Sequence, residues 1–314
     1  MKQGLFDALI GKQWAVKRGY LPADPYLETI LGQVELDASL RSRKPSPIMN
    51  RGYFARVECI QSLIRSFLQS HSESLEVQMV NMGCGYDTLS LQLIAAPEKN
   101  FSSIFEVDYN ENIERKAAFL SNSEKLLVSK ITDVECGYDI AFTETTETSL
   151  RLLGSDLNDS SSVLLKLVGA GLDPNVPTLI LSECVMVYIE RETCKKLLST
   201  ISSFLQSDAT WVTYDMTNAG DTFGRTMLKN LQTAGYSVPG FEQNPSKADH
   251  EELFASSGWA EAVQCVTMLE GYSSLVSEKE KRRVGQLERF DEMEEWNLLM
   301  SHYCLTSAST SKKG

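Results

Sequence analysis

The sequence predicts an α/β fold in which a mostly parallel sheet carries helices on both faces. Short apolar runs typical of buried strands alternate with longer amphipathic runs typical of helices. The first strand ends in Gly-x-Gly, and two later strands end in an acidic residue, as expected where ligands meet the carboxyl ends of parallel strands. A chain of 314 residues also buries roughly 75% of its unfolded surface, enough for a full core.

Three helical segments are predicted ahead of the first strand, because their apolar side chains recur at spacings of three and four. They cover residues 3–18, 25–40 and Met49–Leu68. Pro45 and Pro47 interrupt helical structure, so Arg41–Pro47 is predicted to be a loop. These N-terminal helices either cap the edge of the sheet and narrow a pocket there, or simply cover one of its faces.

Strands and helices alternate through residues 77–215. The predicted strands are Val77–Met82, Phe101–Val107, Leu150–Leu153, Thr178–Val187 and Thr210–Asp215. The predicted helices between them are Tyr86–Ala95, residues 110–127, Ser160–Val168 and Arg191–Leu205. This order is typical of a parallel sheet with crossover helices.

The last third breaks this alternation. Helices are predicted at Asp221–Ala234, Lys247–Ser257 and Ser277–Trp296, and strands at Glu261–Met268 and Leu298–Leu305. We expect one domain over residues 1–306, in which residues 1–70 are helical, 77–215 form the core, 216–260 form an inserted helical cap and 261–306 close the fold. The small polar tail Ser307–Gly314 is predicted to be disordered.

Composition excludes several classes of function. There are 42 acidic and 30 basic residues, and the 21 bases beyond residue 60 face 36 acids, which argues against nucleic-acid binding. The first 60 residues carry nine bases and six acids, which suits an anionic ligand but also fits chance clustering. Seven cysteines without Cys-x-x-Cys and three isolated histidines predict no disulfide framework, no metal site and a reducing compartment, the cytoplasm. No apolar run approaches the roughly 18 residues that span a membrane.

The strongest local signal is the strand Val77–Met82 with the loop Gly83-Cys-Gly85 that follows it. Glycines in this position let the backbone approach a ligand without a Cβ in the way. The third glycine of the dinucleotide fingerprint is missing, and Asp87 would repel a pyrophosphate. A cofactor with sulfonium and ammonium groups would not be repelled, which favours S-adenosylmethionine over NAD. The alternative is a tight structural turn.

Acidic residues follow at other strand ends. Glu106 and Asp108 close the second strand, and we favour Asp108 as the acceptor for ribose hydroxyls because it lies nearer the carboxyl end. Asp156 can accept from an adenine amino group while the next backbone N–H, that of Leu157, bonds a ring nitrogen. Glu183 stands in a very apolar strand, so it is either a functional acid or half of a structural ion pair.

Five stretches combine into a more specific pattern. They are Asn50-Arg-Gly-Tyr-Phe-Ala-Arg56-Val, Asn81-Met-Gly83-Cys-Gly85-Tyr-Asp87-Thr, Phe105-Glu-Val-Asp108, Ser182-Glu183-Cys-Val and Gly220-Asp-Thr-Phe-Gly224. Together they resemble the eukaryotic leucine carboxyl methyltransferases, over a likeness that runs from about Lys12 to Leu305. These enzymes use S-adenosylmethionine to methylate the C-terminal leucine carboxylate of the protein phosphatase 2A catalytic subunit.

The resemblance implies a Rossmann-like class I methyltransferase fold and a set of cofactor contacts. Lys12 and Arg56 match basic residues near the methionine carboxylate, Gly83 the glycine loop, Asp108 the ribose acid, Asp156 and Leu157 the adenine contacts, and Glu183 the acid near the methionine moiety. Tyr188 and Tyr214 follow strand ends and are expected near the acceptor. No catalytic residue is expected, because a terminal carboxyl group has an unperturbed pKa of roughly 3.3–3.7 and needs no general base.

Two alternatives stay open. A related branch acts in wybutosine synthesis on transfer RNA and carries a kelch-repeat domain, and a methyltransferase acting on a small-molecule or RNA carboxylate would share the cofactor core. The absence of repeats in this chain and its acidic body favour the phosphatase branch. The other alternative is a non-catalytic phosphatase-binding protein that has kept the cofactor fold.

Overall fold

A nine-stranded sheet with the strand order β3-β4-β5-β2-β1-β6-β7-β9-β8 runs through the computed structural model. The structure describes residues 2–34, 45–96, 101–121, 128–135, 137–142 and 148–310. The ends of the predicted helices 25–40 and 110–127, most of the loop Arg41–Pro47 and residues 311–314 of the predicted tail lie outside these ranges.

The central strands of this sheet are parallel. The strands are β1 (Gln78–Met82), β2 (Ser103–Asp108), β3 (Val128–Val134), β4 (Gly137–Phe142), β5 (Ser149–Gly154), β6 (Thr178–Glu183), β7 (Ala209–Met216), β8 (Ala262–Thr267) and β9 (Tyr303–Ser309). Parallel ladders join β5, β2, β1, β6 and β7 in that order. Strands β4 and β9 run antiparallel to both of their neighbours. The predicted α/β class with a mostly parallel sheet is confirmed.

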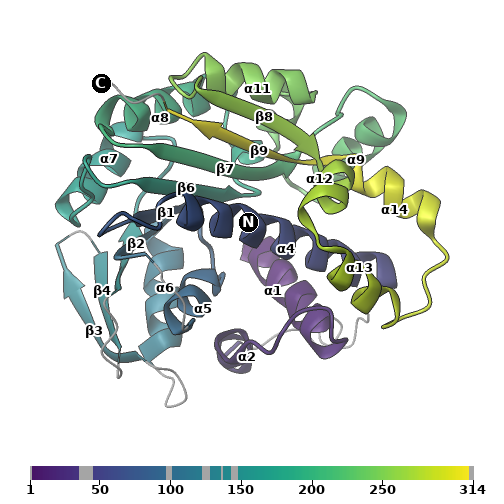
Figure 1. The fold of residues 1–314 in the computed structure, drawn as a ribbon, viewed down its shortest axis with the longest axis horizontal. Coiled ribbons are helices and arrows are strands. Elements are labelled where there is room, and N and C mark those ends of the chain that lie inside the picture. Colours follow the sequence, from purple (N-terminus) through teal and green to yellow (C-terminus); the bar gives the residue numbers. More distant parts are fainter. Residues whose placement is uncertain are drawn as a thin grey trace.

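Helices cover both faces of the sheet (Figure 1). One face carries α1 (Lys2–Lys17), α4 (Pro47–Ser70), α5 (Leu89–Ala95), α6 (Asn110–Ser121), α12 (Met268–Leu275), α13 (Glu278–Gly285) and α14 (Met293–Met300). The other carries α7 (Ser160–Gly169), α8 (Arg191–Phe204) and α11 (Lys247–Ala255). Alternate strand residues serve the two sides: Met79 packs into the first core and Val80 into the second. Helix α2 (Pro25–Gly32) packs beside α1 and α6.

Several strand and helix ends differ from the prediction where the backbone turns sharply. The strand predicted as Thr178–Val187 ends at Glu183, because Cys184 adopts φ +58° and a 3-10 turn, η1 (Met186–Tyr188), follows. The helix predicted from Tyr86 begins at Leu89, after the glycine loop. Pro47 is the first residue of α4 rather than part of a loop, a position where the missing N–H costs nothing.

The hairpin β3–β4 was not predicted at all. It lies at the edge of the sheet. In β3 polar and charged residues interrupt the apolar ones, whereas β4 does carry an alternating apolar face of Tyr138, Ile140 and Phe142, a signal that sequence reasoning missed.

The C-terminal segment also differs. The single helix predicted over Ser277–Trp296 is wrong: α13 and α14 are separate, and between them Glu288 accepts from Asn50 while Phe290 packs against Arg51. Strand β9 continues to Ser309, so the predicted disorder is wrong for residues 307–309, which pair with β7 and β8.

The region predicted as an inserted cap divides into two parts. Helices α9 (Thr222–Thr233) and α10 (Pro239–Gln243) pack around η1 at the carboxyl end of β6. Helix α11 instead contacts β8, β9 and α8 on a face of the sheet. The limits of one domain over 1–306 stay a prediction. Within the described ranges, no helix combines the length and hydropathy that crossing a membrane requires.

Candidate active site

A depression opens at the carboxyl ends of β1 and β6. The strand order reverses between these neighbours, and such switch points are where open parallel sheets bind ligands. The depression takes in about 530 Å³, a volume that includes open solvent at its mouth. Its lining is Ala8, Leu9, Lys12, Tyr53, Arg56, Asn81, Gly83, Cys84, Gly85, Tyr86, Asp87 and Glu183.

The glycine loop forms one wall of this depression. Gly83 and Gly85 have φ values of +67° and +50°, which glycine adopts without steric cost. The N–H of Gly83 donates to the carbonyl of Val107 at 2.7 Å, and the N–H of Gly85 donates to Asp108 Oδ2 at 2.7 Å. The loop is therefore held against the end of β2.

Two buried ion pairs cross the depression. Lys12 of α1 pairs with Asp87, and Arg56 of α4 pairs with Glu183 at the end of β6. The four side chains are between 12% and 18% exposed. Glu183 is thus half of an ion pair, one of the alternatives left open by the sequence, and it also lines the depression, while its role as a functional acid stays a prediction.

Lys12, Arg56 and Asp87 keep their charges at neutral pH. Burial acts to lower the pKa of Lys12, but the carboxylates of Asp87 and Glu183 outweigh it and raise that pKa. Burial is also the largest single influence on Arg56 and acts in the same direction, but Glu183 together with Cys184 and Tyr214 outweighs it, so the pKa of the guanidinium rises. Burial acts to raise the pKa of Asp87, but the interaction with Lys12 acts in the opposite direction, and the pKa of Asp87 lies below its usual value. The depression therefore presents two cations and two anions.

Asp108 lies beside the depression and is already well bonded. Its Oδ1 accepts from the N–H of Tyr109 and from Asn112 Nδ2, both at 2.7 Å, and its Oδ2 accepts from Gly85. A carboxylate has about four lone-pair sites, so one remains for a ligand. Glu106 instead pairs with Lys116 in the protein interior.

Asp156 and Leu157 lie at the neighbouring strand end. Strand β5 pairs with β2, and the N–H of Ser155 donates to the carbonyl of Asp108 at 2.7 Å. Asp156 is exposed, and its Oδ1 accepts from the N–H and the side chain of Asn158. These two residues therefore share an edge with Asp108 but do not line the enclosed depression.

The two predicted acceptor tyrosines differ in exposure. Tyr188 is the last residue of η1 and is 41% exposed, whereas Tyr214 is 5% exposed. The guanidinium of Arg56 lies 4.6 Å above the ring of Tyr214, which stacks on Tyr303 at 5.3 Å. Tyr188 is thus available to a ligand, while Tyr214 supports Arg56.

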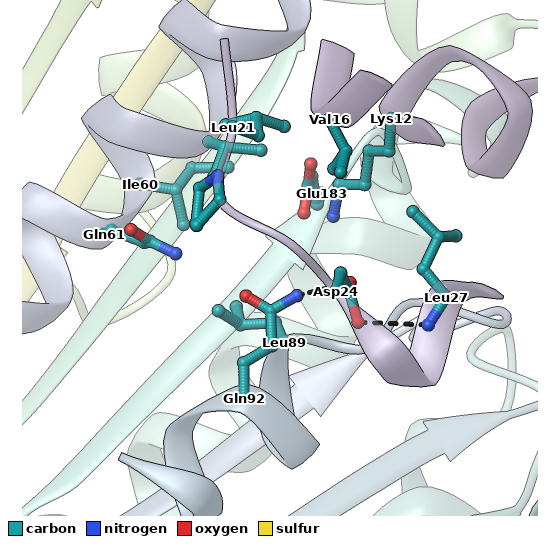
Figure 2. Close-up of a pocket in the computed structure, with 12 residues that line it drawn as sticks. Lys12, Val16, Leu21, Asp24, Leu27, Ile60, Gln61, Leu89, Gln92 and Glu183 are labelled. Carbon is teal, nitrogen blue, oxygen red and sulfur yellow. Dashed lines mark hydrogen bonds between the residues drawn. The ribbon is translucent and has the colours of Figure 1, made fainter. Parts of the chain in front are cut away.

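A second cavity adjoins the first (Figure 2). Lys12 and Glu183 line both cavities, and in Figure 2 their side chains lie side by side at one end. The rest of the wall of this second cavity is largely apolar and includes the side chains of Val16, Leu21 and Ile60. Asp24 caps α2 through the N–H groups of Tyr26 and Leu27 and accepts from Gln92, which ties α2 to α5.

Sequence reasoning missed several residues of the site. Asp87 had been used only to argue against a pyrophosphate, and its pairing with Lys12 was not expected. Tyr53 lies one turn before Arg56 in the run already singled out, a spacing of three that places both on one face of α4. Tyr303 had no signal, because its contact with Tyr214 depends on the register of β9.

Comparison with known proteins identifies the family. The family model "Leucine carboxyl methyltransferase" matches residues 12–202, more than half of the chain. The chain belongs to the leucine carboxyl methyltransferase family. The leucine carboxyl methyltransferase 1 homolog of Arabidopsis thaliana is 32% identical over 309 residues, covering 98% of this chain and 88% of the relative. Leucine carboxyl methyltransferase 1 of Bos taurus is 32% identical over 305 residues, covering 96% and 87%.

A second branch of relatives has a different name. Human tRNA wybutosine-synthesizing protein 4 is 28% identical over 308 residues, covering 96% of this chain but 43% of its own length. Among solved structures, a putative methyltransferase from Thermobifida fusca superposes with a TM-score of 0.53 at 12% identity, covering 91% and 93% of the two chains. The plantazolicin methyltransferase BamL gives 0.50 at 8% identity, covering 98% of each. The predicted class I methyltransferase fold is confirmed.

The family depends on S-adenosylmethionine, so the predicted cofactor is confirmed. The depression fits its methionine end, which carries a carboxylate and an ammonium group, because the two ion pairs offer both signs of charge. Asp87 Oδ2 is buried without a hydrogen-bond partner among the described residues. A Cβ at Gly83 would stand 2.5 Å from Val185, so the loop has no room for a side chain.

Asp215 provides a test of electrostatics behind the site. It is fully buried at the end of β7, and burial raises its pKa to about 7, partly offset by the hydroxyl of Thr213. The folded state then binds more protons than the unfolded state between about pH 4 and pH 7, so stability falls as pH rises through this range. Raising the pH from 5 to 8.5 should therefore destabilise the natural protein, but this contribution is missing in Asp215→Asn, whose side chain does not titrate. We expect the free energy of unfolding of Asp215→Asn, taken relative to the natural protein, to be about 3 kcal/mol higher at pH 8.5 than at pH 5.

Urea unfolding of both proteins at the two pH values measures this gain. Asp291→Asn is the matched control, because that carboxylate is 71% exposed and should shift stability equally at both pH values. An Asp215→Asn effect that does not change with pH would contradict the prediction.

Proposed function

We propose that the protein methylates the α-carboxylate of the C-terminal leucine of the protein phosphatase 2A catalytic subunit, giving a methyl ester. The observation that carries the proposal is the match to relatives named leucine carboxyl methyltransferase 1 over 96–98% of this chain and 87–88% of theirs. The charge pattern of the depression supports it, because the site supplies binding groups but no general base.

The cofactor contacts are assigned as follows. S-adenosylmethionine supplies an electrophilic methyl group when bound. Lys12 and Arg56 bind the carboxylate of its methionine part, and Glu183 accepts from the ammonium. The Arg56–Glu183 pair therefore exchanges each partner for a ligand group of the same sign, while Lys12 stays paired with Asp87 and shares the carboxylate with Arg56, so no buried charge is left uncompensated.

The remaining contacts follow the edge of the sheet. Asp108 accepts from the ribose through the lone pair left on its carboxylate. Asp156 and the N–H of Leu157 bind the adenine at the end of β5, and Gly83 leaves space for close approach of the backbone.

The acceptor needs orientation rather than a base. A terminal carboxylate is ionised at neutral pH, since its ordinary pKa is roughly 3.3–3.7. Holding the carboxylate oxygen in line with the methyl group and the sulfur, with water excluded, can lower the barrier to methyl transfer by ~7–11 kcal/mol. Tyr188, on the open side, orients the carboxylate, and Tyr214 acts by supporting Arg56. A cation that held the acceptor tightly would stabilise the ground state, and pairing with Glu183 moderates the charge of Arg56.

Methylation of transfer RNA is the second candidate, because the human wybutosine-synthesizing relative matches 96% of this chain. Its weakness is electrostatic. Beyond residue 60 the chain has 36 acids and 21 bases, and RNA binding requires neutralisation of phosphates by basic side chains.

The deciding experiment uses labelled S-adenosylmethionine and three acceptors. These are the intact catalytic subunit, the same subunit without its terminal leucine, and transfer RNA. We expect the label to appear on the intact subunit alone, and base treatment to release it, because base hydrolyses a methyl ester. Label on RNA would establish the second candidate instead. No label on any acceptor, with S-adenosylhomocysteine still bound, would indicate a non-catalytic binder.

A further inference from the structure

A lysine and a glutamate are buried together beneath the glycine loop. Glu106 stands on β2 and Lys116 on α6, and their side chains are 1% and 0% exposed. Lys116 Nζ lies 2.6 Å from Glu106 Oε2. No neutral donor of the described residues bonds either oxygen of Glu106, so the ammonium compensates the carboxylate. Fully buried lysines are rare, and one beside a binding loop calls for a reason.

Lys116 has a second contact, with the loop itself. Its Nζ donates to the backbone carbonyl of Asp87 at 2.6 Å. Asp87 is the residue whose carboxylate pairs with Lys12 across the depression. Lys116 does not line the depression, so any effect on a ligand there passes through the loop.

Several contacts anchor the loop on β2 and α6, among them those of Tyr86, whose hydroxyl donates to Asn112 Oδ1 at 3.5 Å and whose ring packs against Phe119. Gly83 and Cys84 donate to the carbonyl of Val107, and Gly85 donates to Asp108. These two anchors hold the first half of the loop. The contact from Lys116 holds the second half, after the two positive φ angles, where the chain turns toward α5. A charged donor makes this the strongest kind of hydrogen bond available at that point.

We propose that Lys116, held by Glu106, is a positioning residue that fixes the second half of the glycine loop and so places the Asp87 carboxylate opposite Lys12. The pair raises cofactor affinity without touching the cofactor. Replacing the pair by neutral side chains of similar volume removes the anchor without leaving a buried charge, because neither partner remains ionised.

Two variants isolate this role. Glu106→Gln with Lys116→Met, the double variant, removes the anchor and leaves neither partner ionised. Lys195→Met is the matched control, because it removes a lysine from a surface pair with Glu192 on α8. We expect S-adenosylhomocysteine affinity, measured by calorimetry, to fall roughly tenfold or more in the double variant and to stay within about threefold of the natural protein in the control.

Two further readouts separate positioning from general stability. In the ligand-free proteins, amide hydrogen exchange at residues 83–87 should be at least roughly tenfold faster in the double variant than in Lys195→Met, with exchange in β8 and β9 unchanged. In turnover, KM for S-adenosylmethionine should rise while kcat at saturation is kept.

Equal binding and equal loop exchange in the two variants would overturn the proposal. So would loss of the cooperative thermal transition in the double variant, since Lys116 would then support the whole fold. The inference rests on the proposed cofactor pocket only for its binding and turnover readouts. If the natural protein did not bind S-adenosylhomocysteine, the cofactor assignment would fail, and the exchange experiment would still decide the role of Lys116.

Discussion

Arg56→Ala is expected to weaken binding of S-adenosylhomocysteine by about 100-fold. The guanidinium is 17% exposed, pairs with Glu183 and rests on the ring of Tyr214 at 4.6 Å. Its removal takes away a partner of the methionine carboxylate, while Glu183 keeps only its contact with the ammonium. The lost contact is a charge-assisted hydrogen bond in a partly buried site, so the loss exceeds that of a neutral hydrogen bond.

Calorimetry with S-adenosylhomocysteine measures the loss, and two variants locate its cause. Arg65→Ala is the matched control, because Arg65 lies on the same helix in an exposed pair with Glu58 and should leave affinity unchanged. Arg56→Ala with Glu183→Gln also removes the acceptor assigned to the ligand ammonium and should lower the affinity further. Unchanged affinity in Arg56→Ala would show that the residue does not serve the cofactor.

The strand ends of the site could be predicted from the sequence, because they depend on local order alone. Gly83, Asp108 and Glu183 each follow an apolar run, and parallel strands bring such ends to one edge. The choice of Asp108 over Glu106 also followed from position along one strand. In the structure Glu106 pairs with Lys116, whereas Asp108 accepts from the glycine loop, and the role of Asp108 toward a ribose stays a prediction.

The ion pairs could not be predicted, because each depends on how a distant helix lies on the sheet. Lys12 and Asp87 are 75 residues apart, and Arg56 and Glu183 are 127 residues apart. Local periodicity specifies that α1 and α4 are helices but not which strand end each crosses. The same limit explains the C-terminal helices, whose break is set by contacts of Glu288 and Phe290 with α4.

The largest structural effect is expected from a methyl group at Gly83. Its φ of +67° costs any other residue ~1 kcal/mol or more. An added Cβ would also stand 2.5 Å and 3.0 Å from the two γ-carbons of Val185, in the turn that follows Glu183. Gly83→Ala must therefore move either the glycine loop or the turn after Glu183, and both are walls of the cofactor site. We expect S-adenosylhomocysteine affinity to fall more than about 100-fold, with a loss of about 3 kcal/mol in the free energy of unfolding.

A double-mutant cycle can separate clash from backbone strain. Val185→Ala removes both γ-carbons, so adding it to Gly83→Ala should recover the part of the affinity that the clash removes, while the strain at φ +67° remains. Gly235→Ala is the control for strain alone, because its φ is +84° and no atom lies within 4 Å of the added Cβ. It should lose ~1 kcal/mol of stability and bind the ligand as the natural protein does. If Gly83→Ala behaved like Gly235→Ala, the glycine loop would not lie against the ligand, and the cofactor would have to bind elsewhere on the sheet edge.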